Sequence, residues 1–236
     1  MLKKRIVASL IVKNDIVVQS IGFKKYLPVG KIDIAVEFLN NWGIDEIIIL
    51  DIDKTRINKA PNISNLNKAS LKCHIPLSIG GGITKIEHVK SLMNNGADKV
   101  CLNNSAINNP VLISEAASIY GNQSVIVSID VLKTEKGYYV YDYMNNKPLN
   151  ISPSKFAFDV EKLGAGEVLI NSVNNDGFYC GYDYDLLEKV CKNVSVPVIA
   201  CGGAKNAYDI LKVLQKTNVS AACAGNFFHF FEHSVN

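Results

Sequence analysis

The chain repeats one pattern twice at a fixed spacing, and this repeat limits its fold more than any other feature. "GIDEIIILD" from Gly43 aligns with "GAGEVLINS" from Gly164, at an offset of 121 residues (164 minus 43). "IPLSIGGGI" from Ile75 aligns with "VPVIACGGA" from Val196 at the same offset (196 minus 75). Self-similarity at a fixed period indicates a fold built from repeated units, so we expect two similar halves.

Short β-branched runs alternate with amphipathic segments along both halves. Parallel strands joined by helical crossovers produce this alternation, although an open doubly wound sheet would show it as well. The repeat favours closure, because eight strands in two equal halves are what a (β/α)8 TIM barrel requires. We therefore predict an α/β fold, a single barrel domain over residues 1–236 built from two half-barrel repeats. The predicted strands are RIVASLIV, DEIIILDI, IPLSIGG, KVCLNN, SVIVSID, EVLINSV, VPVIACGG and AACAGN; the predicted helices cover 32–42, 63–71, 86–95, 110–120, 153–163 and 207–216, and a small β-excursion covers 136–150.

The composition excludes several classes of partner. A net charge of +3 with scattered lysines gives no nucleic-acid patch. No apolar run approaches the roughly 20 residues that cross a bilayer, and the start has no small-residue cleavage site, so we expect a cytoplasmic protein without a membrane partner. The six cysteines form no C-x-x-C pair and have no histidines at metal spacing. We expect reduced thiols, and nothing in the sequence indicates a metal or an organic cofactor.

Glycines cluster at the carboxyl ends of the predicted strands, which form the working face of a barrel. Glycine lets backbone amides approach an anion closely, and a following helix amino terminus adds positive partial charge. One glycine turn is only a tight turn, but two pairs related by the repeat predict two phosphate sites across one mouth. We expect either a ligand with two phosphates or a ligand with one phosphate that leaves the second site empty. The predicted phosphate- and substrate-binding residues of these turns are Gly81, Gly82, Asn103, Asn104, Ser105, Gly202, Gly203, Gly225 and Asn226.

One carboxylate, Asp130, ends the fifth predicted strand and is expected to stand in the middle of the mouth. A partly desolvated carboxylate can act there as a general acid or base, or it can fix a loop by accepting backbone hydrogen bonds. The repeat sets Ile11 opposite Asp130, at an offset of 119 (130 minus 11) that needs a two-residue adjustment. Asp51, Asp176 and Gly177 also face the mouth, and for them substrate binding and loop structure are equally open.

The opposite ends of the strands carry charge. Arg5, Glu46, Lys99 and Glu167 each stand at the amino-terminal end of a predicted strand. Two cations and two anions that converge there would neutralise one another, yet buried ion pairs stabilise poorly compared with apolar packing. Stability is therefore an allowed but incomplete reason for a charged barrel floor.

The motifs DEIIILDI, IPLSIGGGI, GADKVCLNNSAI, YGNQSVIVSID, GAGEVLINSVNNDG, GYD and VPVIACGGA span nearly the whole chain. Through them the chain resembles the cyclase subunit of imidazole glycerol phosphate synthase, of histidine biosynthesis. The resemblance implies a barrel docked as a heterodimer on a glutamine amidotransferase, a glutaminase whose ammonia travels through the barrel to a bisphosphorylated substrate. It implies that the four floor residues form an ammonia gate, that Asp98 faces the amidotransferase, and that Asp130 is one of two acid–base aspartates of a lyase-type cyclase.

The chain departs from this family in the reacting pocket. The other family aspartate falls at Ile11, a lysine of the first loop at Gln19, and a threonine of the sixth strand at Asn171. Losing one acid–base group costs roughly 10²–10⁴ in rate, so ring closure is expected to be impaired unless another carboxylate substitutes. The family also continues through a final helix after "HFFEHSVN", so we expect less cover over the barrel wall around residues 227–231.

Three functions fit this pattern. The first is an ammonia-accepting synthase subunit of the histidine type. The second is a divergent, cyclase-impaired barrel that activates a glutaminase and delivers ammonia for amidation of a surface-polysaccharide or flagellin sugar; Ile11 and Gln19 favour it. The third is a non-catalytic docking subunit, which Ile11 favours and the intact phosphate turns oppose. A related isomerase of the same pathway needs carboxylates at both strand ends and no gate, so this chain opposes it.

Overall fold

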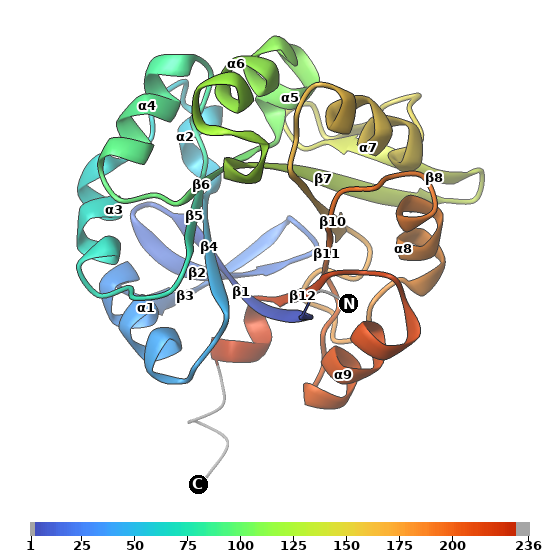
Figure 1. The fold of residues 1–236 in the computed structure, drawn as a ribbon. Coiled ribbons are helices and arrows are strands. Elements are labelled where there is room, and N and C mark those ends of the chain that lie inside the picture. The colour runs from blue at the N-terminus through green and yellow to red at the C-terminus, as the bar shows by residue number, and fades with distance from the viewer. Residues whose placement is uncertain (1–2, 230–236) are drawn as a thin grey trace, which may run out of the picture.

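A ring of eight parallel strands lies at the centre of the computed structural model, which describes residues 3–229 (Figure 1). Each strand pairs with the next one around the ring, and the pairing of β10 with β7 completes the circuit. The sheet is therefore closed, which confirms the predicted (β/α)8 barrel and excludes the open doubly wound sheet. The barrel strands are β1 (Arg5–Lys13), β4 (Glu46–Asp51), β5 (Leu77–Gly80), β6 (Lys99–Leu102), β7 (Val125–Thr134), β10 (Glu167–Ser172), β11 (Val198–Cys201) and β12 (Ala221–Ala224).

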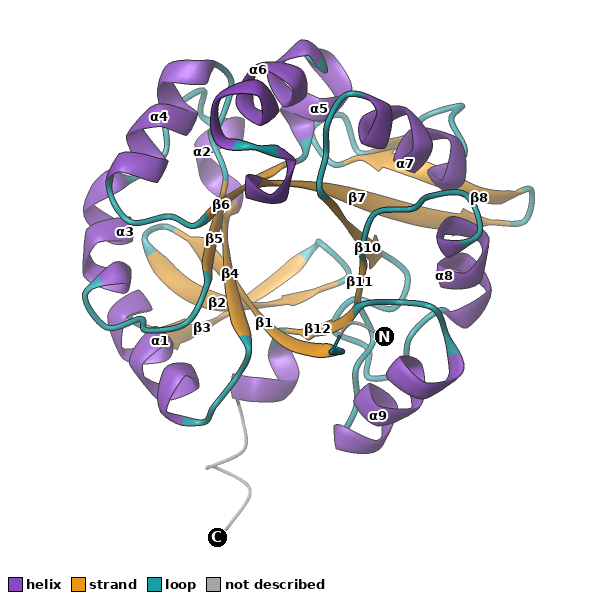
Figure 2. Cartoon of the chain, viewed as in Figure 1, coloured by secondary structure: helices purple, strands orange, loops and turns teal. Residues whose placement is uncertain are grey.

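Helices cover the outside of the ring (Figure 2). Local signals start several of them: the Ser152 hydroxyl accepts a hydrogen bond from the amide of Lys155, and Pro153 fills the first helical position. The six predicted helices are confirmed to within one residue at each end. Those covering the barrel are α1 (Ile32–Asn41), α3 (Ile63–Ser70), α4 (Ile86–Asn94), α6 (Val111–Tyr120), α7 (Pro153–Lys162), α8 (Tyr184–Cys191) and α9 (Ala207–Lys216); the short ones are α2 (Ile52–Arg56), α5 (Asn104–Asn108), η1 (Asn122–Ser124) and η2 (Asn226–His229).

A β-hairpin follows the first strand of each half. The predicted excursion is confirmed as β8 (Gly137–Asp142), antiparallel to β7, with β9 (Lys147–Pro148) beside it. A second hairpin, β2 (Ile16–Ile21) and β3 (Lys25–Gly30), extends β1 and was not predicted. Its first turn uses Asn14 and Asp15 at positive φ, a conformation these two residue types tolerate well. The duplication therefore includes the hairpins as well as the strands.

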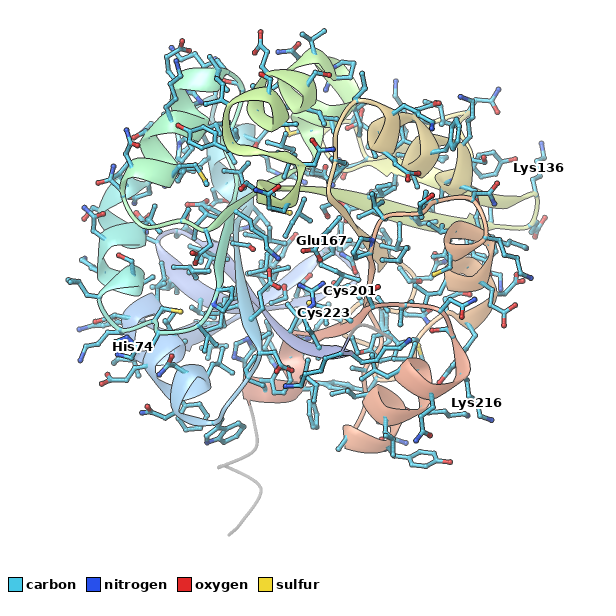
Figure 3. All side chains as sticks on the ribbon, in the orientation of Figure 1. His74, Lys136, Glu167, Cys201, Lys216 and Cys223 are labelled. Atoms are coloured by element: carbon cyan, nitrogen blue, oxygen red, sulfur yellow. The ribbon has the colours of Figure 1, made fainter. Side chains whose placement is uncertain are left out.

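The barrel wall separates two apolar clusters. Successive side chains of a strand point to opposite faces, so neighbours such as Val7 and Ala8 join different clusters. The larger cluster lies between strands and helices. The smaller one fills the barrel and includes Val7, Ile48 and Leu169. Figure 3 shows Glu167, Cys201 and Cys223 inside the ring, and His74, Lys136 and Lys216 outside it.

Two aromatic residues near the end of the described chain pack on the core. Phe228 is only 7% exposed, and its ring tilts against that of Phe227 with centroids 5.1 Å apart. The chain is thus packed at these two positions. Phe230 and Phe231, which belong to the prediction for residues 227–231, lie outside the described residues. Across residues 3–229 there is no helix with the length and apolar character to cross a membrane.

Candidate functional site

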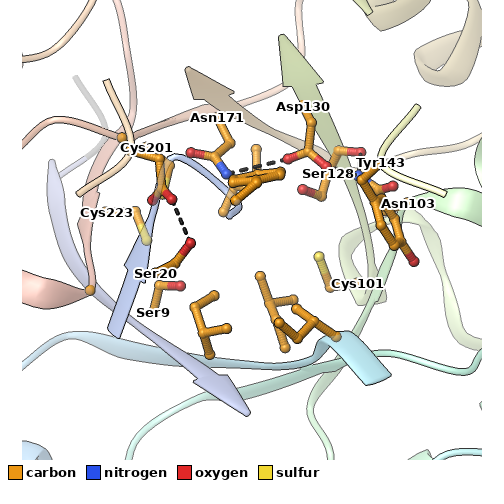
Figure 4. A pocket seen from close by; sticks show the side chains of 18 of the residues that line it. Ser9, Ser20, Cys101, Asn103, Ser128, Asp130, Tyr143, Asn171, Cys201 and Cys223 are labelled. Atoms are coloured by element: carbon orange, nitrogen blue, oxygen red, sulfur yellow. Dashed lines mark hydrogen bonds between the residues drawn. The ribbon is translucent and has the colours of Figure 1, made fainter. Parts of the chain in front are cut away.

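A pocket opens at the carboxyl ends of the barrel strands (Figure 4). Its lining combines residues from both halves of the chain, as the repeat predicted. All thirteen residues predicted to face the mouth contribute to it: Asp51, Gly81, Gly82, Asn103, Asn104, Ser105, Asp130, Asp176, Gly177, Gly202, Gly203, Gly225 and Asn226. The sequence therefore located the pocket correctly.

The two glycine pairs have matching backbone conformations. Gly81 and Gly82 have φ of 111° and 69°, and Gly202 and Gly203 have φ of 90° and 100°. A Cβ on Gly81 would lie 2.2 Å from the carbonyl oxygen of Asp51, so only glycine fits there. The turns bring main chain close to the pocket on opposite sides, although the Gly82 amide already donates to Thr55 Oγ1 at 3.1 Å.

Asp130 is 6% exposed at the centre of the pocket. Its Oδ2 accepts a hydrogen bond from Asn103 Nδ2 at 3.0 Å, and its Oδ1 accepts one from Asn171 Nδ2 at 3.3 Å. Burial raises the pKa of Asp130 to about 7, because the two amide donors only partly offset the loss of solvent and the charge of Asp176 adds to the rise. A carboxyl group with such a pKa can both accept and donate a proton near neutral pH.

Asp51, Asp176 and Asn226 also hold loops in place. Asp51 caps α2 by accepting hydrogen bonds from two backbone amides, at 3.2 and 3.3 Å. The Asp176 carboxylate accepts a 2.6 Å bond from the Ser20 hydroxyl, and burial raises its pKa to about 6. Asn226 exchanges two hydrogen bonds with the backbone of Ser20. The loop role is thus present for each, and the same residues reach the pocket.

The position related by the repeat to Asp130 is apolar. Ile11 lines the pocket and stands beside Leu50 in the ladder between β1 and β4. Gln19, which we expected in the reacting pocket, is not among its described lining residues; this part of the prediction is wrong. Gln19 is 4% exposed on β2, where the next residue, Ser20, lines the pocket. Successive side chains of a strand point to opposite faces, so Gln19 lies on the other face of β2, where it interacts with the hydroxyl of Tyr179.

The pocket contains residues that the sequence did not single out. Hydroxyls and thiols form its base, and aromatic side chains with one arginine form its rim. The base could have been found, because Ser9 and Ser128 lie two positions before Ile11 and Asp130 and so share their face of the strand. The rim residues lie on the hairpins and α2, and the pattern of the barrel strands does not predict where these elements lie in space. The added lining residues include Ser9, Ser128, Cys101, Cys201, Cys223, Phe23, Tyr26, Tyr143 and Arg56.

The four charged residues of the predicted floor converge as the sequence indicated. Arg5 donates to Glu46 Oε2 at 2.6 Å and to Glu167 Oε2 at 2.5 Å. Lys99 Nζ donates to Glu46 Oε1 at 3.0 Å and to Glu167 Oε1 at 2.6 Å. Each cation bridges both carboxylates, so the ring is neutral as a whole. Ser78, which the sequence analysis missed, donates a further 2.9 Å bond to Glu46 Oε1.

This ring is largely withdrawn from water. The side chains of Glu46 and Glu167 are 1% and 9% exposed. Burial alone would raise the pKa of Glu167, but the hydrogen bond from Arg5 and the charge of Lys99 outweigh it and lower that pKa. Neither carboxylate could remain buried and ionised without its cations, so the ring holds together as one unit.

Asp98, predicted to face a partner, is exposed beside this floor. Its Oδ2 accepts a 2.8 Å bond from the amide of Leu77, which fixes the start of β5. Asp45 does the same for the amide of Ile6, also at 2.8 Å. Each precedes a floor residue in sequence and accepts the same kind of backbone bond, but Asp98 is exposed whereas Asp45 is half-buried and paired with Lys3.

An apolar cluster lies inside the barrel between the floor and the mouth. The inner cluster of Val7, Ile48, Ile126, Leu169 and Ile199 fills the barrel above the ion ring. Cys101, Ala221 and Cys223 complete it, and burial raises the pKa of the Cys101 thiol. All six cysteines are free thiols. The inner core therefore contains no charged side chain between the ion ring and Asp130 among the residues that form it.

Comparisons with known proteins agree with this architecture. The family model described as "Histidine biosynthesis protein" matches residues 5–234. A protein of Vibrio vulnificus (strain YJ016) named "Putative imidazole glycerol phosphate synthase subunit hisF2" is 41% identical over 235 residues, covering 100% of this chain and 86% of that protein. Proteins named "Imidazole glycerol phosphate synthase subunit HisF" are 40% identical in Bacillus cereus (strain G9842) and 39% in Pelodictyon phaeoclathratiforme (strain DSM 5477 / BU-1), each covering 100% of this chain and 94% of the relative.

Proposed function

The chain belongs to the histidine biosynthesis protein family, and from this premise we propose that it is the ammonia-accepting barrel subunit of an imidazole glycerol phosphate synthase-like glutamine amidotransferase complex. The observation that carries the proposal is that the two ends of the barrel differ in their chemistry. A neutral ring of buried ions closes the floor, and a pocket with a single central acid opens at the mouth. The side chains between the two ends are apolar, so a route past them would suit a small uncharged molecule better than an ion.

The floor is the proposed entry for ammonia. The partner is a glutaminase subunit that docks over the exposed rim, with Asp98 in the contact, and the two form a heterodimer. Ammonia enters when Arg5 or Lys99 swings away from its carboxylates. Because each cation is shared by both carboxylates, one can move while the other still holds the ring, so opening does not leave both carboxylates unpaired.

The mouth is the proposed substrate site. The glycine turns at Gly81 and Gly202 bind the two phosphates of a bisphosphorylated ligand through backbone amides. Asp130 lies between them as the acid–base group. The reaction is of the cyclase, lyase-type class, it needs no metal or organic cofactor, and it takes place in the cytoplasm.

A second function is favoured by one specific observation, the apolar pair of Ile11 and Leu50 at the position where the family has its other aspartate. Under this alternative the barrel still activates a glutaminase and conducts ammonia. It then hands the ammonia to a separate enzyme that amidates a surface-polysaccharide or flagellin sugar. In the limiting case the barrel only docks on the glutaminase.

The deciding experiment uses the purified barrel with ammonium salt at alkaline pH, where more of the ammonium is present as ammonia. The family's bisphosphorylated ribonucleotide is titrated in, and binding and turnover are measured separately. Turnover supports the synthase. Saturable binding without turnover supports the second function, and absence of both refutes the proposed substrate site.

A matched pair of variants sharpens this result. Ile11→Asp with Gln19→Lys restores the family residues, and we expect it to raise turnover by at least tenfold if the pocket still fits the ribonucleotide. The control is Ile11→Asn with Gln19→Lys, because asparagine has nearly the size of aspartate but cannot transfer a proton. An equal rate in both variants would mean that the pocket has been rebuilt for another ligand.

A further inference from the structure

The ladder position occupied by Asp130 differs sharply between the two halves. On β7 and β10, Asp130 stands opposite Asn171. The repeat relates Asn171 to Leu50 (171 minus 121), and Leu50 stands opposite Ile11 on β4 and β1. The same place in the fold therefore holds an acid–amide pair in one half and a purely apolar pair in the other.

Two amides hold Asp130 from both neighbouring strands. Asn171 comes from β10, and Asn103 follows β6 on the other side. Each donates its Nδ2 to a different carboxylate oxygen, and Asn103 Nδ2 is also held by the carbonyl oxygen of Ser128 at 3.0 Å. The Oδ1 atoms of Asn103 and Asn171 are buried and have no hydrogen-bond partner.

An unsatisfied buried acceptor is costly, so the orientation of these amides needs a reason. Both turn their NH₂ groups to Asp130 and leave their own oxygens unpaired. An ionised carboxylate, which accepts at both oxygens and donates at neither, makes the fullest use of two donors placed in this way. The amides thus fix the plane of the carboxylate and stabilise its negative charge, while their own Oδ1 atoms stay without a hydrogen bond.

The charge surroundings of Asp130 are otherwise unfavourable to ionisation. The groups that face it are the Asp176 carboxylate from the loop after β10, the Cys101 thiol of β6, and the hydroxyls of Tyr26 and Tyr143 from the two hairpins. None of the lysines and arginines in residues 3–229 forms an ion pair with it. Arg56, the one lysine or arginine among the described lining residues, donates instead to the carbonyl oxygen of Tyr143 at 3.0 Å. A neutral clamp therefore replaces the cation that usually accompanies a buried carboxylate.

We propose that Asn171 is a positioning residue that, with Asn103, clamps Asp130 between neutral donors so that this one carboxyl group performs both proton steps at the mouth. Deprotonated, Asp130 takes a proton from an N–H or O–H of the ligand and becomes a neutral acid. It then returns that proton to another ligand atom, so the group ends as it began. A cation in place of the amides would hold the carboxylate ionised and prevent the second step. This inference rests on the proposed function and explains how a mouth with Ile11 could still move protons.

The test is a carboxyl ¹³C NMR titration of the ligand-free protein labelled at aspartate. The Asp130 signal is identified by its absence in Asp130→Asn. In Asn171→Leu, which copies the residue of the other half, we expect the Asp130 titration midpoint to rise by on the order of one pH unit, because one donor to the ionised form is lost. Asn171→Thr keeps a hydroxyl donor and should raise the midpoint less, which also serves if the leucine variant fails to fold.

The internal symmetry supplies the control. Leu50→Asn places an amide at the related position, beside Ile11, and should leave the Asp130 midpoint at its wild-type value. An unchanged midpoint in both Asn171 variants, or an equal shift in Leu50→Asn, would overturn the proposal. Because no ligand is present, a protein that fails to bind the bisphosphorylated ribonucleotide but titrates as expected would refute the proposed substrate and leave the clamp standing.

Discussion

Replacing Arg5 by methionine should destabilise the barrel far more than an ordinary surface substitution. Methionine keeps much of the side-chain length and removes only the charge and the donors. In this variant Glu46 and Glu167, whose side chains are 1% and 9% exposed, would keep Lys99 as the one cation of the ring. Breaking a buried ion pair by removing one partner costs about 3–5 kcal/mol. Since the Arg5 side chain is itself 24% exposed, we expect the lower end, about 3 kcal/mol.

For a chain of this size, about 3 kcal/mol corresponds to a fall in Tm of roughly 6–12 °C. The assay is thermal and urea unfolding of the isolated barrel at pH 7.5. Lys3→Met is the matched control on the same face, because Lys3 pairs with Asp45 at 3.3 Å while its side chain is 86% exposed. An exposed pair of this kind contributes within about 0.5 kcal/mol, so the control should unfold close to the wild type.

The pH dependence gives a second, independent check. Arg5 lowers the folded-state pKa of Glu167, so the stability it contributes is present above the ordinary glutamate value of 4.5 and is lost as the pH falls through the folded pKa. The penalty of Arg5→Met should therefore shrink in acid as Glu167 becomes neutral. A variant as stable as Lys3→Met at pH 7.5, or a penalty that stays constant down to pH 4, would refute the reasoning about the ion ring.

Three further predictions concern other parts of the barrel. Asp130→Asn should gain stability relative to wild type between pH 4 and pH 8, by up to about 4 kcal/mol. The folded pKa of Asp130, about 7, exceeds the ordinary 3.8, so the cost of burying the ionised form is absent below about pH 4 and complete above pH 7. Urea unfolding at both pH values checks this, and an equal stability difference at both would contradict it. Asp98→Asn keeps an acceptor for the Leu77 amide, so Tm should be nearly unchanged. Binding of the glutaminase subunit, measured by calorimetry, should weaken at least fivefold, and it should weaken less in the control Asp45→Asn. Equal effects in the two variants would remove Asp98 from the interface. Gly81→Ala should lower Tm and abolish binding of the bisphosphorylated ribonucleotide, because the added Cβ would lie 2.2 Å from the Asp51 carbonyl oxygen at a φ of 111°. Gly43→Ala is the control: the Cβ added there would have no atom within 4 Å, so this variant measures the cost of positive φ alone.

The sequence predicted the barrel well because its main signal is periodic. Buried parallel strands read as short β-branched runs, and the offset of 121 residues aligned them in pairs. The floor was predictable for the same reason, since Glu46 and Glu167 occupy the first positions of strands related by the repeat. The position of a residue along a strand decides whether its side chain lies at the floor or at the mouth of the barrel. The strand pattern in the sequence was therefore enough to assign these residues to the floor.

The rim of the mouth was less predictable. The β2–β3 hairpin contains Pro28 and has an irregular register near Val17, which weakens a strand pattern. Gln19 was misplaced because the hairpin, and not its distance from β1, decides where it points. The amide clamp on Asp130 depends on contacts among three strands, and the sequence showed Asn171 only as a departure from the family.

The anchoring of the β2–β3 hairpin has a consequence for how the chain matures during synthesis. The hairpin leaves the ribosome early, yet the residues that fasten it come much later: Ser20 is bound by Asp176, 156 positions along the chain, and by Asn226, 206 positions along it. Contacts so distant in sequence form late, because the loop entropy they close must be offset by structure already in place. The nascent barrel should therefore keep an open, unfinished rim until Asp176 and Asn226 have been synthesised, which delays ligand capture to a late stage of folding.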